Sequence, residues 1–271
     1  MGSCFVKNIL RHRKGCIQFS SWEWFENVEC MEYIFVLTLF IIAFFYSSVG
    51  HGGASGYLAV MALFGIAPAF MRSTALSLNV FVSAIAFVTY TRAGYFRSRL
   101  IMPFLITSIP MAFVGALVKV KPDIYEIILG IFLLFAVARM LFIPGAVSEH
   151  PSKPPVLIAL LIGATLGFFS GMIGIGGGII LSPILILFHW ASVKESAAAS
   201  AMFIFLNSLA GLLALVQQGL SLEPKLLMWI GAGVLGGIAG SYWGSSRLKP
   251  LRLKYVLSAI LLLASIKLLM L

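Results

Sequence analysis

Apolar residues run almost continuously along the chain after residue 32, and short groups of glycine, proline and polar residues interrupt them. A helix that crosses a bilayer needs about 20 consecutive apolar residues, fewer where it is broken or re-entrant. By that criterion the pattern predicts ten segments, at 33–49, 54–66, 73–91, 101–118, 124–143, 156–173, 178–190, 197–217, 226–244 and 253–271. We therefore predict an all-α protein, a polytopic membrane helical bundle.

The segments repeat along the chain. Adding 124 to the bounds of the first five gives the second five within a few residues, and the glycine-rich breaks at 50–53 and 174–178 fall at the same place in each copy. The segments that follow the breaks, 54–66 and 178–190, are too short to cross a bilayer. We expect each to form a helical hairpin with the segment before it, bent at the glycines.

The duplication predicts how the chain is divided. We expect a polar N-terminal extension at 1–32, a first membrane repeat at 33–143, a linker at 144–155 and a second membrane repeat at 156–271. Each repeat crosses the membrane an odd number of times, so the two are expected to be inverted relative to each other. Basic residues divide almost equally between the two sides, so the orientation stays open. Residues 1–32 are expected to be a peripheral tail, or else the native chain starts at Met31.

Composition agrees with a membrane protein and indicates the charge of the transported substrate. The chain is 61% hydrophobic and 10% charged, with a mean hydropathy of +1.04 and a net charge of +10. Soluble proteins have about 45–50% apolar and 25% charged residues. After residue 32 the acidic residues are Asp123, Glu126, Glu149, Glu195 and Glu223, all in loops or near segment ends. Cation carriers usually need a carboxylate in the membrane interior, so this pattern favours an anion. The alternative is that the basic loops only contact lipid headgroups.

The glycine breaks are the candidate substrate site. A helix that restarts inside the bilayer presents unpaired N–H groups and a partial positive charge at its first turn, and glycine lets an oxyanion approach them closely. Polar side chains in and after the breaks add donors. The candidate substrate-binding residues are Gly50, His51, Gly52, Gly53, Ser55, Ser77, Asn79, Gly174, Gly176, Gly177, Gly178, Ser182, Ser200 and Asn207.

Two other features have structural interpretations. Glycines recur every four residues at 163, 167 and 171 and again at 236, 240 and 244, which predicts close helix packing rather than a site. His51 lies inside the first break, where the second copy has Ile175. Its imidazole either binds a proton, which would make the proton a candidate coupling ion, or bonds a backbone carbonyl.

These residues resemble a known family. The run Phe168-Phe-Ser-Gly-Met-Ile-Gly-Ile-Gly-Gly-Gly178, followed by Ser182-Pro183 and the Ala/Ser-rich 196–201, is similar to the sulfite exporter TauE/SafE family of bacterial membrane transporters. Tyr46-Ser-Ser-Val-Gly-His-Gly-Gly53, with Asn79 downstream, resembles that family's first motif. The likeness covers about 33–271 and departs at His51, where a small apolar residue is usual. It implies export of sulfite or organosulfonates across the bacterial inner (plasma) membrane.

The expected function is therefore secondary transport, as an exporter, of a small inorganic or organic sulfur-containing anion by alternating access of two inverted repeats. A passive anion channel and a non-transporting membrane assembly subunit remain alternatives. Gly53-Ala-Ser-Gly56 resembles the motif of intramembrane serine proteases, but the downstream candidate for the histidine, His189, sits near a segment end in the other repeat. No cofactor or metal motif is present. The protein is expected to lie in a lipid bilayer and not to bind nucleic acid. The sequence does not decide whether it forms a homo-oligomer.

Overall fold

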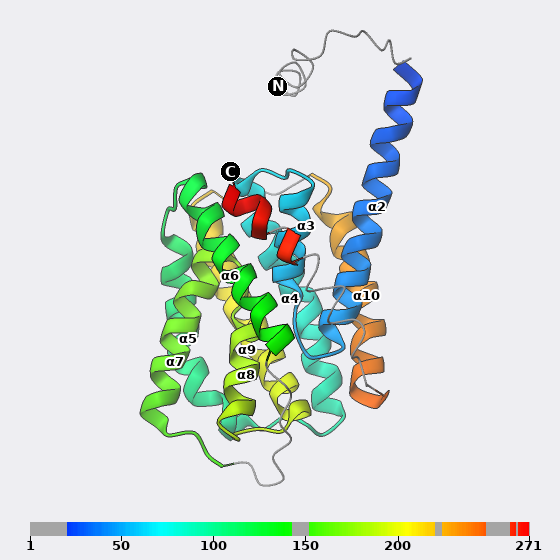
Figure 1. Cartoon of the computed structure of the whole chain (residues 1–271). Coiled ribbons are helices and arrows are strands. Elements are labelled where there is room, and N and C mark those ends of the chain that lie inside the picture. Colours follow the sequence, from blue (N-terminus) through cyan, green and yellow to red (C-terminus); the bar gives the residue numbers. More distant parts are fainter. Residues whose placement is uncertain (1–20, 143–151, 220–223, 248–260, 264, 271) are drawn as a thin grey trace. The chain divides into compact units, whose positions relative to one another are not determined.

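The computed structural model describes residues 21–142, 152–219, 224–247, 261–263 and 265–270, and the described chain is helical without a strand (Figure 1). The helices are α2 (Ser21–Ser47), α3 (Ala54–Leu63), α4 (Pro68–Arg92), α5 (Ser98–Leu117), α6 (Pro122–Phe142), α7 (Val156–Ile173), α8 (Gly178–Leu187), α9 (Val193–Gln217) and α10 (Leu226–Arg247), with a short apolar helix at Leu261–Met270. The all-α prediction is confirmed. The chain divides into two compact units, Met1–Phe35 and Val36–Leu271, and the second contains both helix breaks.

Most helix bounds agree with the predicted segments, and α3, α7, α8 and α10 begin at the predicted residues. The main difference is α2, which begins at Ser21 rather than at 33. Hydropathy marks only the part of a helix that fits the hydrocarbon core, whereas the helix itself can continue into polar sequence. The predicted boundary between the extension and the first repeat therefore falls inside a helix.

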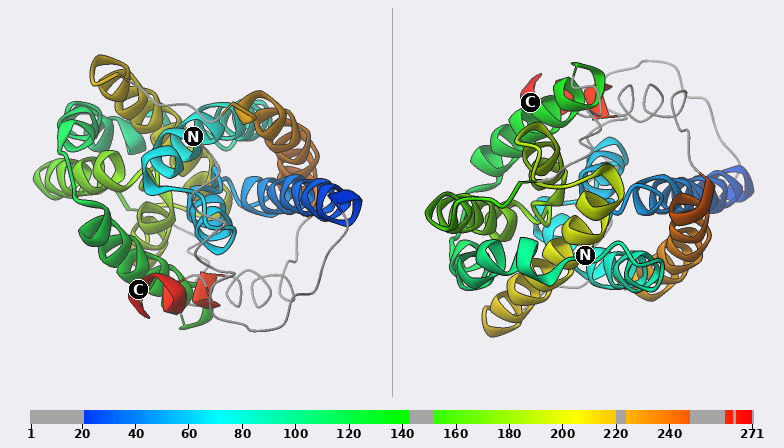
Figure 2. Two further views of the ribbon diagram at one scale, coloured as in Figure 1. Left: turned by 90° about the horizontal axis from the view of Figure 1, so that it is seen from above. Right: turned by 90° about the horizontal axis from the view of Figure 1, so that it is seen from below.

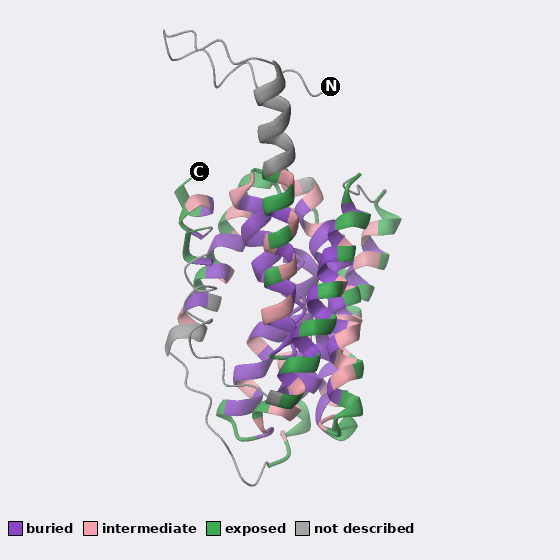
Figure 3. Ribbon diagram, turned by 90° about the vertical axis from the view of Figure 1, so that its right-hand side faces the viewer, coloured by how far each residue is buried: buried purple, intermediate pink, exposed green. Residues whose placement is uncertain are grey.

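Five helices are long and apolar enough to cross a membrane: Phe70–Arg92, Ser98–Leu117, Val156–Ile173, Val193–Gln217 and Leu226–Ser246. Large apolar side chains point out from them, such as Ile106, Leu161 and Leu235, each more than 60% exposed. Figure 3 shows buried and exposed residues on opposite faces of the same helices. An exposed apolar face on every spanning helix is unfavourable in water and favourable in lipid, so these faces are the lipid contact.

The helix lengths repeat as the sequence repeats. Both α3 and α8 have 10 residues, and both α4 and α9 have 25. The starts of α4 and α9 are 125 positions apart, one more than the spacing of the breaks, so Asn79 and Ile204 are each the twelfth residue of their helix. With this spacing of 125, Ser83 on α4 is equivalent to Ser208 on α9. A constant spacing of 124 would instead make it equivalent to Asn207.

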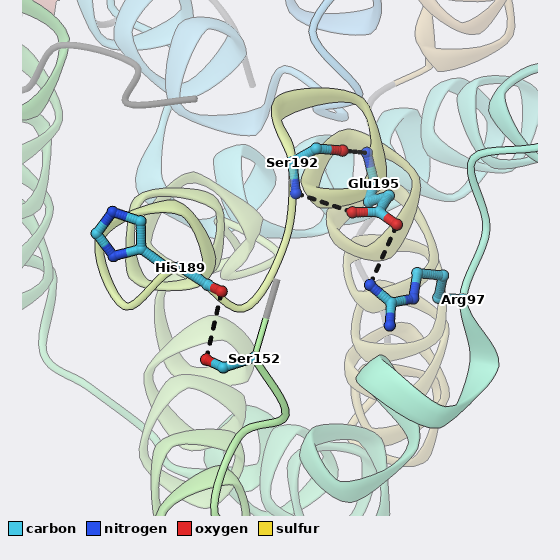
Figure 4. A network of polar contacts seen from close by, with 5 residues as sticks. All are labelled: Arg97, Ser152, His189, Ser192 and Glu195. Atoms are coloured by element: carbon cyan, nitrogen blue, oxygen red, sulfur yellow. Dashed lines mark hydrogen bonds and ion pairs between the residues drawn. The ribbon is translucent and has the colours of Figure 1, made fainter. Parts of the chain in front are cut away.

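The paired helices α4 and α9 lie side by side and run in opposite directions. At one end, Arg97 just after α4 forms an ion pair with Glu195 in the first turn of α9, at 3.2 Å (Figure 4). Lys194 likewise donates to the hydroxyl of Tyr95. At the other end, Arg72 in the first turns of α4 shares a cavity with Gln218, which directly follows α9.

The two glycine stripes are packing faces, as predicted. A Cβ atom added at any of their six positions would overlap a backbone carbonyl of the neighbouring helix, so the helices touch backbone to backbone. On α7, the residues Gly163, Gly167 and Gly171 face the carbonyls of Phe104, Ser108 and Ala112 in α5. On α10, the residues Gly236, Gly240 and Gly244 face those of Phe40, Phe44 and Ser48 at the end of α2.

These contacts join helices from different halves of the sequence. The end of α2 packs on α10, and α10 also packs on α4; correspondingly α7 packs on α5, and α5 also packs on α9 (Figure 2). We call α2 from Val36 onward with α3, α4 and α10 the first bundle, and α5, α7, α8 and α9 the second bundle. Each bundle takes one helix from the other half of the chain, and the two meet along α4 and α9.

Replacing Gly240 by alanine should destabilise the protein, whereas the same change at Gly231, in the same helix, should not. A methyl group at 240 would overlap the Phe44 carbonyl, while at 231 no described heavy atom lies within 4 Å. Overpacking costs about 1–3 kcal/mol, and both variants gain the same helix propensity. Thermal unfolding of the purified protein in detergent measures the difference. Equal melting temperatures for the two variants would contradict the packing role of the stripes.

Candidate functional site

Both helix breaks end in an uncapped helix start. The chain leaves α2 at Ser47 and resumes helix at Ala54, and it leaves α7 at Ile173 and resumes at Gly178. The N-cap residues are Gly53 and Gly177, which have left-handed backbone with φ of 92° and 74°. Glycine accepts this conformation without strain but has no side chain to bond the first-turn N–H groups. In α8 the Ile180 N–H already bonds the Gly177 carbonyl at 3.2 Å, and the N–H groups before it in the first turn have no side-chain cap and are open to an acceptor from outside the helix.

The start of α9, in contrast, is capped by side chains. There the Ser192 hydroxyl accepts from the N–H of Glu195, and the Glu195 carboxylate accepts from the N–H of Ser192 at 2.9 Å (Figure 4). This capping box satisfies the donors reciprocally. The helices that start at the breaks have no such arrangement, although the glycine residues of both breaks are buried.

The structure brings the two breaks together. A Cβ atom at Gly52 would lie 2.9 Å from the Ile204 side chain, and one at Gly176 would lie 2.8 Å from both Ile204 Cγ2 and Asn79 Nδ2. Gly52 also packs directly on the Asn79 amide oxygen. Because Asn79 and Ile204 hold equivalent positions on α4 and α9, each break contacts the same pair of residues. Asn79 and Ile204 thus fill the space between the two breaks.

Asn79 has unused hydrogen-bonding capacity at this point. Its side chain is fully buried, and its Nδ2 donates to Ser208 Oγ at 3.3 Å and to the Ile175 carbonyl at 3.4 Å. Its Oδ1 has no hydrogen-bond partner among the described residues. On α9, Asn207 is also fully buried, and neither of its amide atoms has a partner in the described chain. Buried polar groups without partners are uncommon and call for an explanation.

His51 links the first break to the second bundle. Its Nδ1 lies 3.0 Å from the Val49 carbonyl and its Nε2 lies 3.3 Å from Ser182 Oγ, which in turn lies 2.7 Å from Ser200 Oγ. A carbonyl only accepts, so Nδ1 carries a proton, and when the ring is neutral Nε2 accepts from Ser182. The bond to a backbone carbonyl, one of the two expected roles of His51, is therefore present, and the other ring nitrogen faces the hydroxyls of Ser182 and Ser200.

The remaining candidates divide into two groups. Gly50 packs on the backbone of Ala197 and Gly174 on Arg72, so these two glycines belong to the contact between the bundles, whereas Gly178 packs on Ile204 within the second bundle. Ser55 and Ser77 do not join it. The Ser55 hydroxyl donates to Tyr46 at 2.9 Å, and the Ser77 hydroxyl donates to the carbonyl of Ser73 in its own helix.

The protease arrangement of Ser55 with a histidine is not formed. The side chain of Ser55 bonds Tyr46 instead. His189 lies in the turn after α8, and the bonds to its carbonyl come from Ser152 before α7 (Figure 4).

Two residues at the site are not among the sequence candidates. Ile204 is apolar, like most buried residues of a membrane helix, so its residue type gives no reason to place it at the site. Arg72 falls outside the predicted segment 73–91, but it lies inside α4 and donates from Nε to the Gly171 carbonyl at 3.1 Å. The signal that could have found it is a charge placed within an apolar helix only four residues after Pro68.

Charge around the breaks is consistent with an anion. In the described membrane body the carboxylates are Asp123, Glu126 and Glu195, and none of them is buried. The buried polar groups there are hydroxyls, amides and His51. Such a lining offers hydrogen-bond donors without a countercharge for a cation.

Spanning helices with lipid-facing surfaces and two broken helices that meet in the interior define a multi-pass membrane protein of the transport class. Residues 35–268 match the family model described as "Sulfite exporter TauE/SafE", and the chain belongs to this family. The chain is 35% identical over 237 residues to a probable membrane transporter protein, y4hK, of Sinorhizobium fredii (strain NBRC 101917 / NGR234), covering 86% of this chain and 96% of that protein.

A second relative, the probable membrane transporter protein ORF9 of a Sinorhizobium species, is 27% identical over 226 residues, which cover 79% of this chain and 86% of the relative. No solved structure matches the chain. The family and these relatives, together with the five apolar helices, make this a multi-pass bacterial membrane transporter.

Replacing Asn79 by alanine should lower stability more than replacing Ser77. Both side chains are buried on α4, but Asn79 bonds α9 and the second break, whereas Ser77 bonds only its own helix. Removing the amide leaves the Ile175 carbonyl and the Ser208 hydroxyl without that donor, at a cost of about 1–3 kcal/mol. Thermal unfolding in detergent, in the absence of added anion, tests this. A Ser77→Ala variant at least as unstable as Asn79→Ala would show that the two bundles do not depend on this contact.

Proposed function

We propose that this protein is a secondary transporter, acting as an exporter, of a small sulfur oxyanion such as sulfite or an organosulfonate. The observation that carries the proposal is the meeting of two uncapped helix starts at Asn79. The oxyanion binds between the first turns of α3 and α8 and accepts hydrogen bonds from their N–H groups. The family to which the chain belongs supports this class of cargo.

The energetic argument favours an anion at this place. A charged oxygen gains about 1.5–3 kcal/mol from each hydrogen bond, and a helix start adds about 0.3–1 kcal/mol, or more when partly buried. Several such donors on two sides offset the several kcal/mol that an ion loses when it leaves water. The carbonyl ends of α2 and α7 also lie at the breaks, but no carboxylate of the described membrane body is buried there to balance a cation, and at α7 Arg72 already bonds the Gly171 carbonyl. The amide of Asn79 can turn its Nδ2 group toward the anion as a further donor.

Release and capture require the bundles to move. Asn79 and Ile204 fill the space between the breaks, so an anion enters only when the first and second bundles separate there. Because the glycine stripes lock α7 to α5 and α10 to the end of α2, across the halves of the sequence, the units that move are the bundles rather than those halves. The antiparallel run of α4 and α9 supports an inverted relation between the repeats, and opening on one side or the other then gives alternating access. A closed centre of this kind favours a carrier over an open channel.

The proton is the proposed coupling ion, and His51 is its site. While the ring is neutral, Ser182 donates to Nε2 and can accept from Ser200. A protonated ring donates from Nε2 instead, so Ser182 must turn its hydroxyl toward another acceptor. Protonation therefore reverses the polarity of a hydroxyl chain that joins the first break to α8 and α9. Tyr46 is the titratable side chain packed against His51, with ring centroids 6.5 Å apart; from α8 and α9 the groups that bond this chain are serines.

Anion efflux from proteoliposomes that contain only this chain tests the proposal. Gly176→Ala should reduce the efflux of sulfite at least tenfold, because the methyl group would press on Asn79 and Ile204 and keep the breaks from adjusting to the anion. Gly94→Ala is the matched control: its φ of +83° is as strained as the +80° of Gly176, but no described atom lies within 4 Å of its Cβ position. Equal efflux by both variants would contradict the site, and absent efflux by the wild type would contradict transport.

His51→Gln should remove the pH dependence of transport. Methanesulfonate is the suitable cargo for this test because its charge is constant over the range in which histidine titrates, about pH 5–8. Wild-type efflux should change severalfold between these limits, whereas the glutamine variant, which cannot bind the proton, should give the same rate at both. A variant that keeps the wild-type pH profile would exclude His51 as the coupling site.

A further inference from the structure

A cavity of about 350 Å³ lies where the start of α4, the α5–α6 loop and the end of α9 meet. Its lining residues are Pro68, Arg72, Ser73, Lys119, Val120, Pro122, Tyr125, Leu215, Gln218 and Gly219. We call it the Arg72 cavity. Two of these side chains are cationic, none of the described lining residues is acidic, and hydroxyl and amide groups make up the rest of the polar lining. Because the lining of the cavity is positively charged, its expected ligand is an anion.

Two of the side chains that line the Arg72 cavity bond the last turn of α7, directly before the second break. Arg72 donates to the carbonyl of Gly171, and the hydroxyl of Tyr125 donates to the carbonyl of Ile173 at 3.0 Å. The Arg72 side chain also packs on Gly174, the first residue of the break. A ligand in the cavity is thus one layer of side chains away from the proposed substrate site.

The guanidinium of Arg72 holds two helix ends at once. Besides Gly171 in α7, it donates to the carbonyls of Gly115 and Ala116 at the end of α5 and to that of Val118 just beyond. Carbonyls at a helix end attract a cation, which explains why the charge is stable there. An oxyanion is a stronger acceptor for the guanidinium than a carbonyl, because it adds the attraction between two full opposite charges to the hydrogen bond. An anion that reaches Arg72 therefore competes with the carbonyls that hold α7 in place.

Lys119 is the cation that meets the ligand first. It is exposed at the mouth of the cavity, whereas Arg72 is half-buried behind it. At the opposite end of α4 a second hollow of about 520 Å³ contains Arg97, Arg99 and Lys153. There Arg97 is already paired with Glu195 (Figure 4). Arg72, in contrast, bonds the helix that leads into the second break. The Arg72 cavity has both the charge and the connection to a break.

We propose that the Arg72 cavity is a vestibule that binds the oxyanion at one face of the membrane before it enters, or after it leaves, the site between the breaks. Lys119 captures the anion, and Arg72 passes it inward by exchanging carbonyl acceptors for anion oxygens, which frees the end of α7 to move. This inference rests on the proposed function and adds a second subsite to it. Phosphate groups of lipids share the same chemistry, so the test must separate a soluble anion from a headgroup.

The test compares Lys119→Gln with Lys121→Gln, a neighbouring exposed lysine that does not line the cavity. Methanesulfonate transport is measured in proteoliposomes of phosphatidylcholine alone and again with added phosphatidylglycerol. In both lipids Lys119→Gln should raise KM about tenfold and change the maximal rate less than twofold, because it removes capture and leaves the inner site intact. Lys121→Gln should leave both parameters within twofold of the wild type. A defect that appears only with phosphatidylglycerol would assign the cavity to lipid headgroups and overturn the vestibule.

Anion binding can also be measured without transport. Sulfate or methanesulfonate should raise the melting temperature of the purified protein in detergent. The anion concentration needed for half of this rise should increase about tenfold in Lys119→Gln and stay unchanged in Lys121→Gln. If the wild type transports but the two variants behave alike in both assays, the vestibule is wrong and the proposed function stands. If the wild type does not transport, the proposed function fails, and the vestibule fails with it as a transport subsite whatever the melting curves show.

Discussion

Inside a bilayer every backbone N–H must find an acceptor within the protein, and this constraint organises the whole molecule. The chain interrupts two helices in its buried interior and restarts each from a glycine that cannot cap it. The start of α9, in contrast, is closed by a capping box of Ser192 and Glu195. In the proposed function, a ligand with negative oxygens bonds the donors that the buried helix starts at the breaks leave open.

The second organising feature is the exchange of helices between the halves. Backbone contacts at the glycine stripes fix α7 to α5 and the end of α2 to α10, so each bundle is rigid and contains helices from both repeats. Between the bundles, Gly50 also packs on the Ala197 backbone, but α4 and α9 meet through Asn79, Ile204 and small hydroxyl side chains, and the Asn79 amide oxygen has no partner in the described chain. Tight packing within bundles and a partly unsatisfied polar seam between them are what a protein with two alternative arrangements needs.

Much of this is predictable from the sequence. Hydropathy and the spacing of 124 indicate the class, the duplicated helices and the place of both breaks, because contiguous glycines destabilise a helix and form no packing stripe. Periodicity also identifies the glycine stripes as packing faces, but it cannot name their partners, since a face on one helix says nothing of which helix covers it. Ser77 and Asn79 look alike as polar residues two positions apart, and only the structure separates the one that bonds its own helix from the one that joins the bundles. Arg72 escapes prediction for a similar reason: a charge near a segment start resembles a loop residue until the helix is seen to begin before it.

The most direct measurement is the position of a bound oxyanion. Selenite is a heavier analogue of sulfite, and its anomalous scattering in a crystal of the wild-type protein locates the ion without ambiguity. A peak is predicted beside Asn79 with its centre within about 4 Å of first-turn amide nitrogens of both α3 and α8, the distance set by an N–H···O hydrogen bond and one further bond to the central atom. Selenite that is transported but gives peaks only away from both helix starts would contradict the claim that the freed backbone donors hold the cargo.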